Sequence, residues 1–315
     1  SRWRAGKEAA RIRHGLEEGK IDMVIGTHAL LGEKVKFKDL GLVIVDEEHR
    51  FGVAQKEKLR KLKEGVDAIA MSATPIPRTL QLSLAKIRDI SLINSPPEGR
   101  QAIETYIYKS SPEIIVEAVS RELSRGGAVF FIHNRIESIY RTADKIRKLI
   151  PEASIEVTHG KMSERDLEKS ISRFMVGDVD ILVTTAIVES GLDIPRSNTI
   201  IIDNAHTFGL ADLYQLRGRV GRSDKKAYAY MLIPATGGIS EDARRRLQAI
   251  SELKELGSGY KLALSDLEIR GAGHLFGTEQ SGHIADVGLE LYLDMLEGAV
   301  RRLEGQEDTD EREPE

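Results

Sequence analysis

Cysteine is absent from the 315 residues, so disulfide bonds and thiolate metal sites are excluded. Aromatic side chains are scarce, at 5% of residues, and we therefore expect hydrophobic cores that are mostly aliphatic. No apolar run reaches the roughly 18 residues that a membrane-spanning helix needs, and the first residues do not resemble a secretory signal. These absences together predict a cytoplasmic protein that does not contact a membrane.

A phosphate-binding loop of the form Gly-x-x-x-x-Gly-Lys-Ser/Thr is also missing. The Gly-Lys pairs at Gly6, Gly19 and Gly160 are not followed by Ser or Thr, and none opens a helix after a strand. The sequence therefore excludes a self-contained ATPase of the P-loop type. We expect the chain to be a fragment of a longer protein and not to turn over ATP alone.

The net charge is −4, but the acidic residues are concentrated near the end of the chain. Residues 304–315 contain seven acidic side chains and one basic side chain, so the first 303 residues are slightly basic. A near-neutral body of this kind can hold a local basic groove for phosphates. The acidic segment is typical of a disordered linker or tail.

Three short apolar runs occur early in the chain, and each ends in a polar cluster. The runs are residues 23–25, 42–45 and 68–71, with charged segments of helical pattern between them. This alternation predicts a parallel α/β sheet with its sites at the carboxyl ends of the strands. Because three strands do not complete such a domain, residues 1–98 are predicted to be the C-terminal part of one. We expect the missing strand to leave the apolar face at Val43 and Val45 uncovered.

A second alternation follows a break rich in Pro and Gly at residues 95–101. Five strands are predicted, at residues 128–132, 154–158, 180–184, 199–202 and 227–232. Four helices are predicted, at residues 112–125, 135–149, 163–175 and 209–217. These elements make a complete doubly wound domain over residues 99–235, with Thr184, Asp193 and Arg222 at one edge of its sheet.

The pattern changes after Pro234. Residues 240–256 predict an amphipathic helix, residues 257–282 a Gly-rich irregular segment, and residues 286–303 another helix. Residues 236–303 are therefore predicted to form a separate region before the acidic segment.

The first candidate site is Asp46-Glu47-Glu48-His49, which directly follows an apolar run. A buried strand that delivers two acids to its carboxyl end is the arrangement of a Walker-B motif. In that role Asp46 holds Mg²⁺ through its water shell, and Glu47 polarises the water that attacks ATP. The alternative is a solvated acidic turn, because acids are common at the ends of strands.

The second candidate is Gln215–Arg222, in which Arg219 and Arg222 lie three residues apart among glycines. Planar guanidinium groups with a permanent charge suit a phosphate whose charge changes in the transition state. The alternative is a basic helix end that contacts phosphates without a catalytic role.

The third candidate is residues 184–195, which carry hydroxyls, Gly191 and Asp193 after a predicted strand. Hydroxyls and glycine amides at a helix start bind backbone phosphates, and Asp193 is able to accept a hydrogen bond from a ribose. The alternative is helix capping by Thr and Asp. His133 and His159 raise the question of a metal site. The sequence argues against one, because it has no Cys and no His/Glu pair at ligand spacing.

Together these stretches resemble a known set of helicase motifs. Motifs Ib, II, III, V and VI correspond in order to Gly26–His28, Asp46–His49, Ser72–Arg78, Glu189–Pro195 and Gln215–Arg222. Longer stretches resemble the bacterial transcription-repair coupling factor family of superfamily two, namely DEEHRFGV at 46–53, SATPIPRT at 72–79 and DLEIRGAGHLFGTEQSG at 266–282. The likeness extends over residues 1 to about 303. The chain also resembles the RecG family of branched-DNA helicases, but that family usually has Gln where Glu48 stands and Pro where Ala272 stands.

The resemblance implies tandem RecA-like parallel-sheet lobes, the first one partial, followed by a helical-hairpin translocation motif. It implies ATP and Mg²⁺ as cofactors, with nucleotide contacts at Asp46, His49, Gly191, Asp193, Gln215, Arg219 and Arg222. It implies DNA contacts at Thr27, Asn134, Arg135, His159, Lys161, Thr184 and Thr185. It implies coupling of hydrolysis to stepping at Ser72, Thr74, Arg270 and Gln280.

The resemblance also implies a function and partners. Members of this family track along double-stranded DNA and push stalled RNA polymerase off a lesion. The regions that bind RNA polymerase and the excision-repair damage sensor are expected to lie outside this chain. Two rival interpretations are a RecG-like branched-DNA helicase and a non-catalytic half-motor that only binds nucleic acid.

Overall fold

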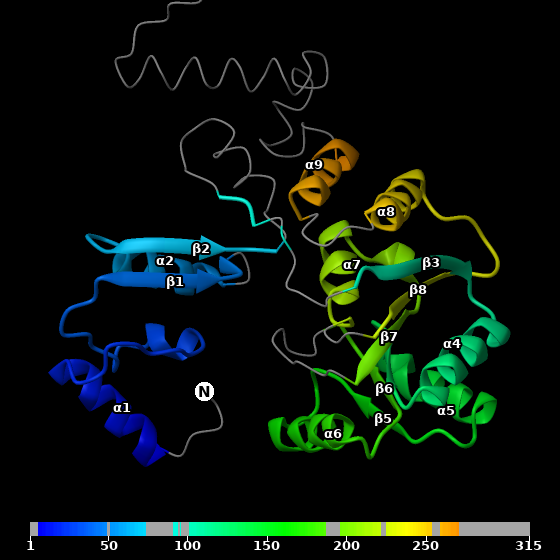
Figure 1. Ribbon diagram of the computed structural model, residues 1–315, viewed down its shortest axis with the longest axis horizontal. Helices are drawn as coiled ribbons and strands as arrows, with labels where there is room; N and C mark the ends of the chain where they lie inside the picture. The colour runs from blue at the N-terminus through cyan, green and yellow to red at the C-terminus, as the bar shows by residue number, and fades with distance from the viewer. Residues whose placement is uncertain are drawn as a thin grey trace, which may run out of the picture. The chain divides into compact units, whose positions relative to one another are not determined.

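The structure is a computed structural model that describes residues 6–48, 51–73, 91–93, 95, 101–186, 196–221, 225–253 and 259–270. The chain divides into two units, Ser1–Ala73 and Thr74–Glu315 (Figure 1). Each unit has a hydrophobic core of its own.

The first unit contains a two-stranded parallel sheet. Its strands are β1 (Leu42–Asp46) and β2 (Asp67–Met71), and its helices are α1 (Gly6–Glu18), the 3-10 helix η1 (His28–Leu31) and α2 (Val53–Leu62). α2 forms the crossover connection that a parallel pair of strands requires. The buried side chain of Leu59 in α2 packs with Val43 and Val45, so α2 covers one face of β1.

The prediction of a strand at residues 23–25 is wrong. These residues are irregular, and the side chains of Met23 and Ile25 are 77% and 89% exposed. A strand needs a neighbour to bond its backbone N–H and C=O groups. In the described part of this unit the two strands pair with each other, and neither pairs with residues 23–25.

The expectation that Val43 and Val45 are uncovered is also wrong. The exposed apolar surface lies on the other face of the sheet, where Leu42 and Ile44 of β1 and Ile69 and Met71 of β2 are each about half exposed. Successive side chains of a strand point to opposite faces, and α2 packs on the face of the two valines.

The second unit contains a six-stranded parallel sheet between two layers of helices (Figure 1). Its strands are β3 (Ile103–Lys109), β4 (Ala128–Ile132), β5 (Ile155–Thr158), β6 (Ile181–Thr184), β7 (Ser197–Ile202) and β8 (Ala227–Ile233). Its helices are α4 (Pro112–Ser124), α5 (Ile136–Leu149), α6 (Glu164–Val176), the 3-10 helix η3 (Ala205–Thr207), α7 (Leu210–Arg217), α8 (Glu241–Glu252) and α9 (Gly259–Arg270). The strand order is β3-β8-β7-β4-β6-β5, which is a doubly wound arrangement.

The two faces of this sheet carry separate apolar clusters. Phe131, Ile201 and Val183 pack with α4 and α5, whereas Phe130 and Ile200 pack with helices that include α7 and α8. Strands that are buried on both faces read as continuous apolar runs, which is why β4, β6 and the second half of β7 are recognisable in the sequence. The parallel α/β class predicted from the sequence is confirmed.

The five strands and four helices predicted for the second domain are all present, within two residues of the predicted bounds. β3 was missed, although its sequence Ile-Glu-Thr-Tyr-Ile-Tyr-Lys has the alternation and the β-branched and aromatic residues of a half-buried strand. β3 lies at the edge of the sheet beside β8 and is only partly buried, whereas β4, β6 and β7 are buried at every position.

The helix predicted at residues 240–256 is present as α8, but the irregular segment predicted from residue 257 is wrong over residues 259–270, which form α9. Leu262 and Ala263 of α9 are buried against the core, and this packing outweighs the weak helical signal of a segment that begins and ends in glycines. The helix predicted at 286–303, and with it the helical hairpin, lies outside the described residues. No helix within the described ranges is long and apolar enough to cross a bilayer.

Candidate nucleotide and nucleic-acid sites

The acidic turn of the first unit begins at the end of β1. Asp46 is the last residue of the strand and is exposed, and Glu47 follows it with a φ of 50°. A residue other than glycine in this left-handed region is uncommon and often marks a functional turn. The backbone N–H of Glu47 donates a hydrogen bond of 2.9 Å to the carbonyl oxygen of Met71, so the end of β2 holds the strained turn in place.

The side chain of Glu47 joins this turn to the segment that follows β2. The hydroxyl of Ser72 donates a hydrogen bond of 3.0 Å to Oε2 of Glu47, and the backbone N–H of Ala73 donates one of 3.3 Å to Oε1. The residues that resemble motifs II and III are therefore bonded to each other. A movement of one segment would therefore disturb the other through these bonds to the carboxylate.

The next acid, Glu48, faces α2 instead. Its Oε2 accepts a hydrogen bond of 2.9 Å from Nζ of Lys63, which caps the C-terminal end of α2. Both side chains are largely shielded, at 31% and 19% exposure, so this pair fixes the turn against α2. His49 and Thr74 lie outside the described residues.

Asp46 fits a cation that is held through water. Its carboxylate has no hydrogen-bond or ion-pair partner among the residues that the structure describes. Within those residues, no group of three or more His, Asp or Glu side chains is placed to cage a metal ion. Mg²⁺ usually keeps several waters and uses one or two carboxylates together with substrate phosphates, which matches a single free acid at a strand end.

In the second unit, α7 and the turn after it carry Gln215 and Arg219, both half-buried. The backbone N–H of Arg219 donates a hydrogen bond of 3.0 Å to the carbonyl oxygen of Leu216, so the chain turns back directly after the helix. Gly221 has a φ of 75°, which places this turn in a conformation that favours glycine. Arg222 lies outside the described residues.

Arg217, between these residues, has a structural role that sequence reasoning missed. Its side chain is buried, its Nη1 donates hydrogen bonds of 2.9 and 2.8 Å to the carbonyl oxygens of Ile250 and Leu253, and it stacks over the ring of Tyr214. Burial lowers the pKa of Arg217. The sequence signal was its position on the buried side of α7, one residue after Leu216.

The residues predicted to contact DNA in the second unit follow strands that end at one edge of its sheet. Ile132 at the end of β4 pairs with Thr184 of β6, and Thr184 pairs with Thr158 of β5. Asn134 and Arg135 follow β4, and both are exposed. Because all the strands are parallel, their carboxyl ends lie at the same edge.

His133 holds the loop that carries Asn134 and Arg135. Its Nδ1 lies 2.7 Å from Oδ2 of Asp203 at the end of β7, and its Nε2 lies 2.7 Å from the hydroxyl of Ser138 in the first turn of α5. The ring is buried, so this network fixes the path of the chain from β4 into α5.

The ring of His159 is also held by hydrogen bonds within the protein, whereas the side chain of Lys161 points to solvent. One ring nitrogen of His159 accepts a hydrogen bond from the backbone of Lys161 and the other contacts Tyr140, whereas the Lys161 side chain is exposed and has no ion pair within the described residues. Tyr140 was not identified from the sequence, where a tyrosine on a helix gives no signal of its neighbour.

Several other predicted residues are buried or lie elsewhere. The side chains of Thr184 and Thr185 are 1% and 2% exposed, and the hydroxyl of Thr184 donates to the carbonyl oxygen of Thr185. Thr27, in the first unit, is exposed and caps η1 through a bond from the N–H of Ala29. Gly191, Asp193, Gln280 and the side chain of Arg270 lie outside the described residues.

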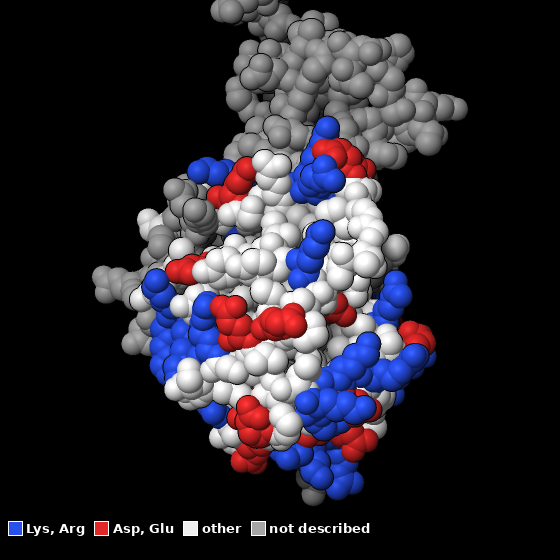
Figure 2. All heavy atoms as spheres, turned by 90° about the vertical axis from the view of Figure 1, so that its right-hand side faces the viewer, with Lys and Arg blue, Asp and Glu red and all other residues white. Residues whose placement is uncertain are grey.

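Lys and Arg are unevenly spread over the surface. Figure 2 shows the face of the second unit that is on the right of Figure 1, where basic side chains gather in clusters between acidic and uncharged stretches. A nearly neutral chain therefore has locally basic surfaces, as phosphate binding requires.

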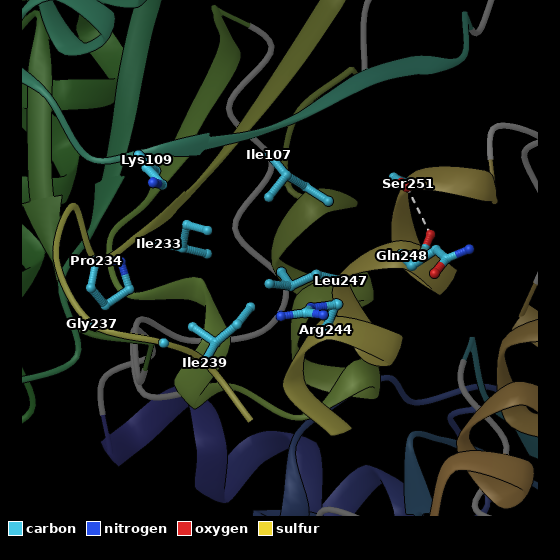
Figure 3. Close-up of a pocket in the computed structure, with 11 residues that line it drawn as sticks. Ile107, Lys109, Ile233, Pro234, Gly237, Ile239, Arg244, Leu247, Gln248 and Ser251 are labelled. Carbon is cyan, nitrogen blue, oxygen red and sulfur yellow. Dashed lines mark hydrogen bonds between the residues drawn. The ribbon is translucent and has the colours of Figure 1, made fainter. Parts of the chain in front are cut away.

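A cavity of about 410 Å³ lies at the carboxyl ends of β3 and β8, beneath α8 (Figure 3). Its walls include Ile107, Ile233 and Leu247, and Arg244 reaches from α8 toward Ile239. None of the predicted nucleotide or DNA residues lines it. Glu47, Asn134 and Arg135 instead follow the ends of strands, and Gln215 and Arg219 lie at the end of α7 and in the turn after it.

Two helicase family models match stretches of this chain. Residues 2–83 match the DEAD/DEAH box helicase family, and residues 110–224 match the helicase conserved C-terminal domain family. The transcription-repair-coupling factor of Staphylococcus epidermidis is 52% identical over 305 residues, which are 97% of this chain and 26% of that protein. That of Staphylococcus aureus is 50% identical over 315 residues, 100% of this chain and 27% of that protein. This chain is homologous to one part of the transcription-repair-coupling factors.

The resemblance inferred from the motifs is thereby confirmed, and the chain spans about a quarter of the length of these relatives. Among solved structures, RecG bound to a three-way DNA junction has a TM-score of 0.68 and 37% identity, over 93% of this chain and 38% of that one. Yeast Dbp5 bound to RNA and ADP BeF3 has a TM-score of 0.51 at 14% identity, over 77% of this chain and 66% of that one, and shows the shared fold alone. The predicted RecA-like helicase fold is confirmed by these domains and neighbours.

Proposed function

We propose that this chain is the part of a transcription-repair-coupling factor that converts ATP hydrolysis into movement along double-stranded DNA. The observation that carries the proposal is the hydrogen bond from Ser72 to Glu47. This bond joins an acid suited to water activation to the segment that continues into the second unit. A motor needs such a link between its site of hydrolysis and the rest of the protein, whereas a solvated acidic turn does not.

The nucleotide roles follow from the chemistry of each side chain. Asp46 would hold Mg²⁺ through water, and Glu47 would orient the attacking water. Arg219 and Arg222 would stabilise the charge that develops on the transferred phosphate, with Gln215, His49, Gly191 and Asp193 as further nucleotide contacts. ATP with Mg²⁺ supplies the phosphoryl group when bound. The sequence contains no phosphate-binding loop, so hydrolysis would need one from elsewhere in the protein.

The DNA contacts would come from both units. Thr27 of the first unit, and Asn134, Arg135 and Lys161 of the second, are exposed and suited to phosphates. Contacts of this kind grip DNA without reading its sequence. Thr184 and Thr185 would contribute through their backbone or after a rearrangement, since their side chains are buried.

The wider function would be displacement of stalled RNA polymerase during repair, as the name of the relatives suggests. Binding of RNA polymerase and of an excision-repair damage sensor is assigned to regions of such a protein other than this chain. A RecG-like branched-DNA helicase is the second candidate, favoured by 37% identity to RecG. The identity of about 50% to the coupling factors favours the first.

A chimera tests this proposal. This chain would replace the matching segment of the Staphylococcus aureus transcription-repair-coupling factor, to which it is 50% identical. We expect DNA-stimulated ATP hydrolysis, displacement of the third strand of a triplex, and release of stalled RNA polymerase. Arg270→Ala or Gln280→Ala should keep hydrolysis but stop triplex displacement. A chimera that processes branched DNA but never releases polymerase would support the RecG-like alternative.

The chain itself provides a second test. The 315 residues should bind duplex DNA with an affinity that falls with salt but should not hydrolyse ATP. Hydrolysis by the unextended chain would contradict the assignment of the phosphate-binding loop to another segment.

A further inference from the structure

Both ring nitrogens of His159 are occupied within the protein. The backbone N–H of Lys161 donates a hydrogen bond of 3.3 Å to Nδ1, and Nε2 lies 3.1 Å from the hydroxyl of Tyr140. The ring is only 9% exposed. His159 therefore has no free nitrogen to offer a phosphate, and a direct contact would break one of these bonds.

The bond from Lys161 decides the direction of the bond to Tyr140. A nitrogen that accepts from an N–H carries no hydrogen, so in the neutral ring the hydrogen is on Nε2. Nε2–H then donates to the oxygen of Tyr140, and the hydrogen of the Tyr140 hydroxyl is directed away from His159. This hydroxyl has no other partner among the residues that the structure describes.

Tyr140 is fixed in place but open to solvent. Its ring packs edge-on against the ring of His159, with centroids 5.7 Å apart and planes at 84°, yet the residue is 55% exposed. It lies on α5, the helix that begins directly after Asn134 and Arg135. An oriented hydrogen-bond donor thus stands at the surface, tied through His159 to the loop of Lys161.

We propose that Tyr140 donates a hydrogen bond to a phosphate oxygen of the bound nucleic acid, and that His159 is a positioning residue that orients the Tyr140 hydroxyl. The inference rests on the proposed binding of DNA by this edge of the second unit. Tyrosine hydroxyls are among the donors that proteins use for backbone phosphates, where they fix position without reading sequence.

Salt dependence separates the hydroxyl of Tyr140 from the charge of Lys161. A cation that contacts a phosphate releases a counterion, so its loss lowers the slope of log K against log salt by about 0.9. A neutral hydroxyl releases none. Its loss should weaken binding by a similar factor at every salt concentration, about 5- to 10-fold for one hydrogen bond of ordinary net strength at an exposed site.

The experiment titrates a fluorescent DNA duplex with the 315-residue chain at a series of NaCl concentrations. We expect Tyr140→Phe to bind about 5- to 10-fold more weakly with an unchanged slope, and Lys161→Ala to bind more weakly with a reduced slope. His159→Phe, which cannot orient the hydroxyl, should match Tyr140→Phe, and the double variant should be no weaker than either. Tyr108→Phe, on β3 and 38% exposed, is the matched control and should bind like the unchanged chain.

Each contrary result has a distinct meaning. If Tyr140→Phe binds within twofold of the unchanged chain while Lys161→Ala is impaired, the proposal for Tyr140 is overturned and DNA binding at this edge is retained. If only Tyr140→Ala is impaired, the ring and not the hydroxyl makes the contact, which also overturns it. If the unchanged chain shows no salt-dependent binding, the proposed function fails and this inference fails with it. Thermal unfolding of Tyr140→Phe should show one cooperative transition, with a loss of stability limited to the hydrogen bond from Nε2 of His159, because the ring and its packing remain.

Discussion

The guanidinium group of Arg217 in α7 donates a hydrogen bond of 2.8 Å to the carbonyl oxygen of Leu253, the C-terminal cap of α8. Two residues 36 positions apart in the sequence are thereby joined, and with them the C-terminal ends of α7 and α8. The carbonyl groups at the end of a helix lack partners within it, and this arginine supplies one.

Arg217→Met should destabilise the second unit by about 2–3 kcal/mol, because the buried carbonyl group of Ile250 and the partly buried one of Leu253 would lose their donor. Arg217→Lys should lower the stability by a smaller amount. Its ammonium group keeps the charge and a donor, but it is a poorer match for two acceptors. Denaturant unfolding measures both. Arg245→Met, on the exposed side of α8, is the control and should change stability by less than about 0.5 kcal/mol.

Glu47→Gln in the chimera should abolish ATP turnover and leave ATP binding intact. The amide removes the carboxylate that orients water, while Asp46 remains available for the cation. Steady-state hydrolysis and nucleotide titration check the two halves of this prediction. Glu57→Gln, an exposed acid paired with Arg60 on α2, should have no effect. Normal turnover by Glu47→Gln would remove its assigned role.

Gly127→Ala should destabilise the second unit by about 2 kcal/mol, the scale for overpacking a well-filled site. A methyl group there would overlap the buried carboxylate of Glu122, which is bonded to Arg125 and Thr199. Thermal unfolding provides the measurement. Gly238→Ala, which has open space around the added methyl group, should be neutral, and equal effects of the two substitutions would contradict this account.

The two faces of β1 should respond differently to the same kind of change. Val45→Thr should lower the protection of residues 42–46 against hydrogen exchange, since a hydroxyl buried without a partner costs about 1–3 kcal/mol. Ile44→Thr should leave that protection nearly unchanged and reduce self-association, because Ile44 is 56% exposed on an apolar strip. Light scattering measures the second effect. The reverse pattern would show that the packing of this sheet has been assigned to the wrong face.

Tyr106 should lose its proton at a higher pH than an ordinary tyrosine. Its hydroxyl donates a hydrogen bond of 2.7 Å to Oε2 of Glu104, which raises the pKa of Tyr106 to about 12. Since this value is above the ordinary one near 10, the stabilisation is fully present below about pH 10 and is lost as the pH rises through 12. Absorbance titration of tyrosinate should show a step that Tyr106→Phe removes and Glu104→Gln moves to lower pH. Burial also raises the pKa of Tyr230. A separate step from Tyr230 at high pH should therefore persist in both variants.

The amino-acid sequence alone determined the class of fold and most of the elements of the second unit. Phe130, Phe131 and their neighbours in β4 form a short apolar run between polar residues, and this pattern depends only on adjacent positions. The motifs around Asp46 and Gln215 are local in the same sense, because each brings its chemical groups together within a few residues.

Tertiary structure decided how those groups are used. Ser72 meets Glu47 across 25 residues, and Tyr140 meets His159 across 19, so neither pairing is visible in any local pattern. Arg217 and Arg219 belong to one motif, yet the first is buried against α8, whereas the second is only half-buried in the turn. A side chain's chemistry is set by its own atoms, but its burial and its hydrogen-bond partners are set by segments that reach it only when the chain folds.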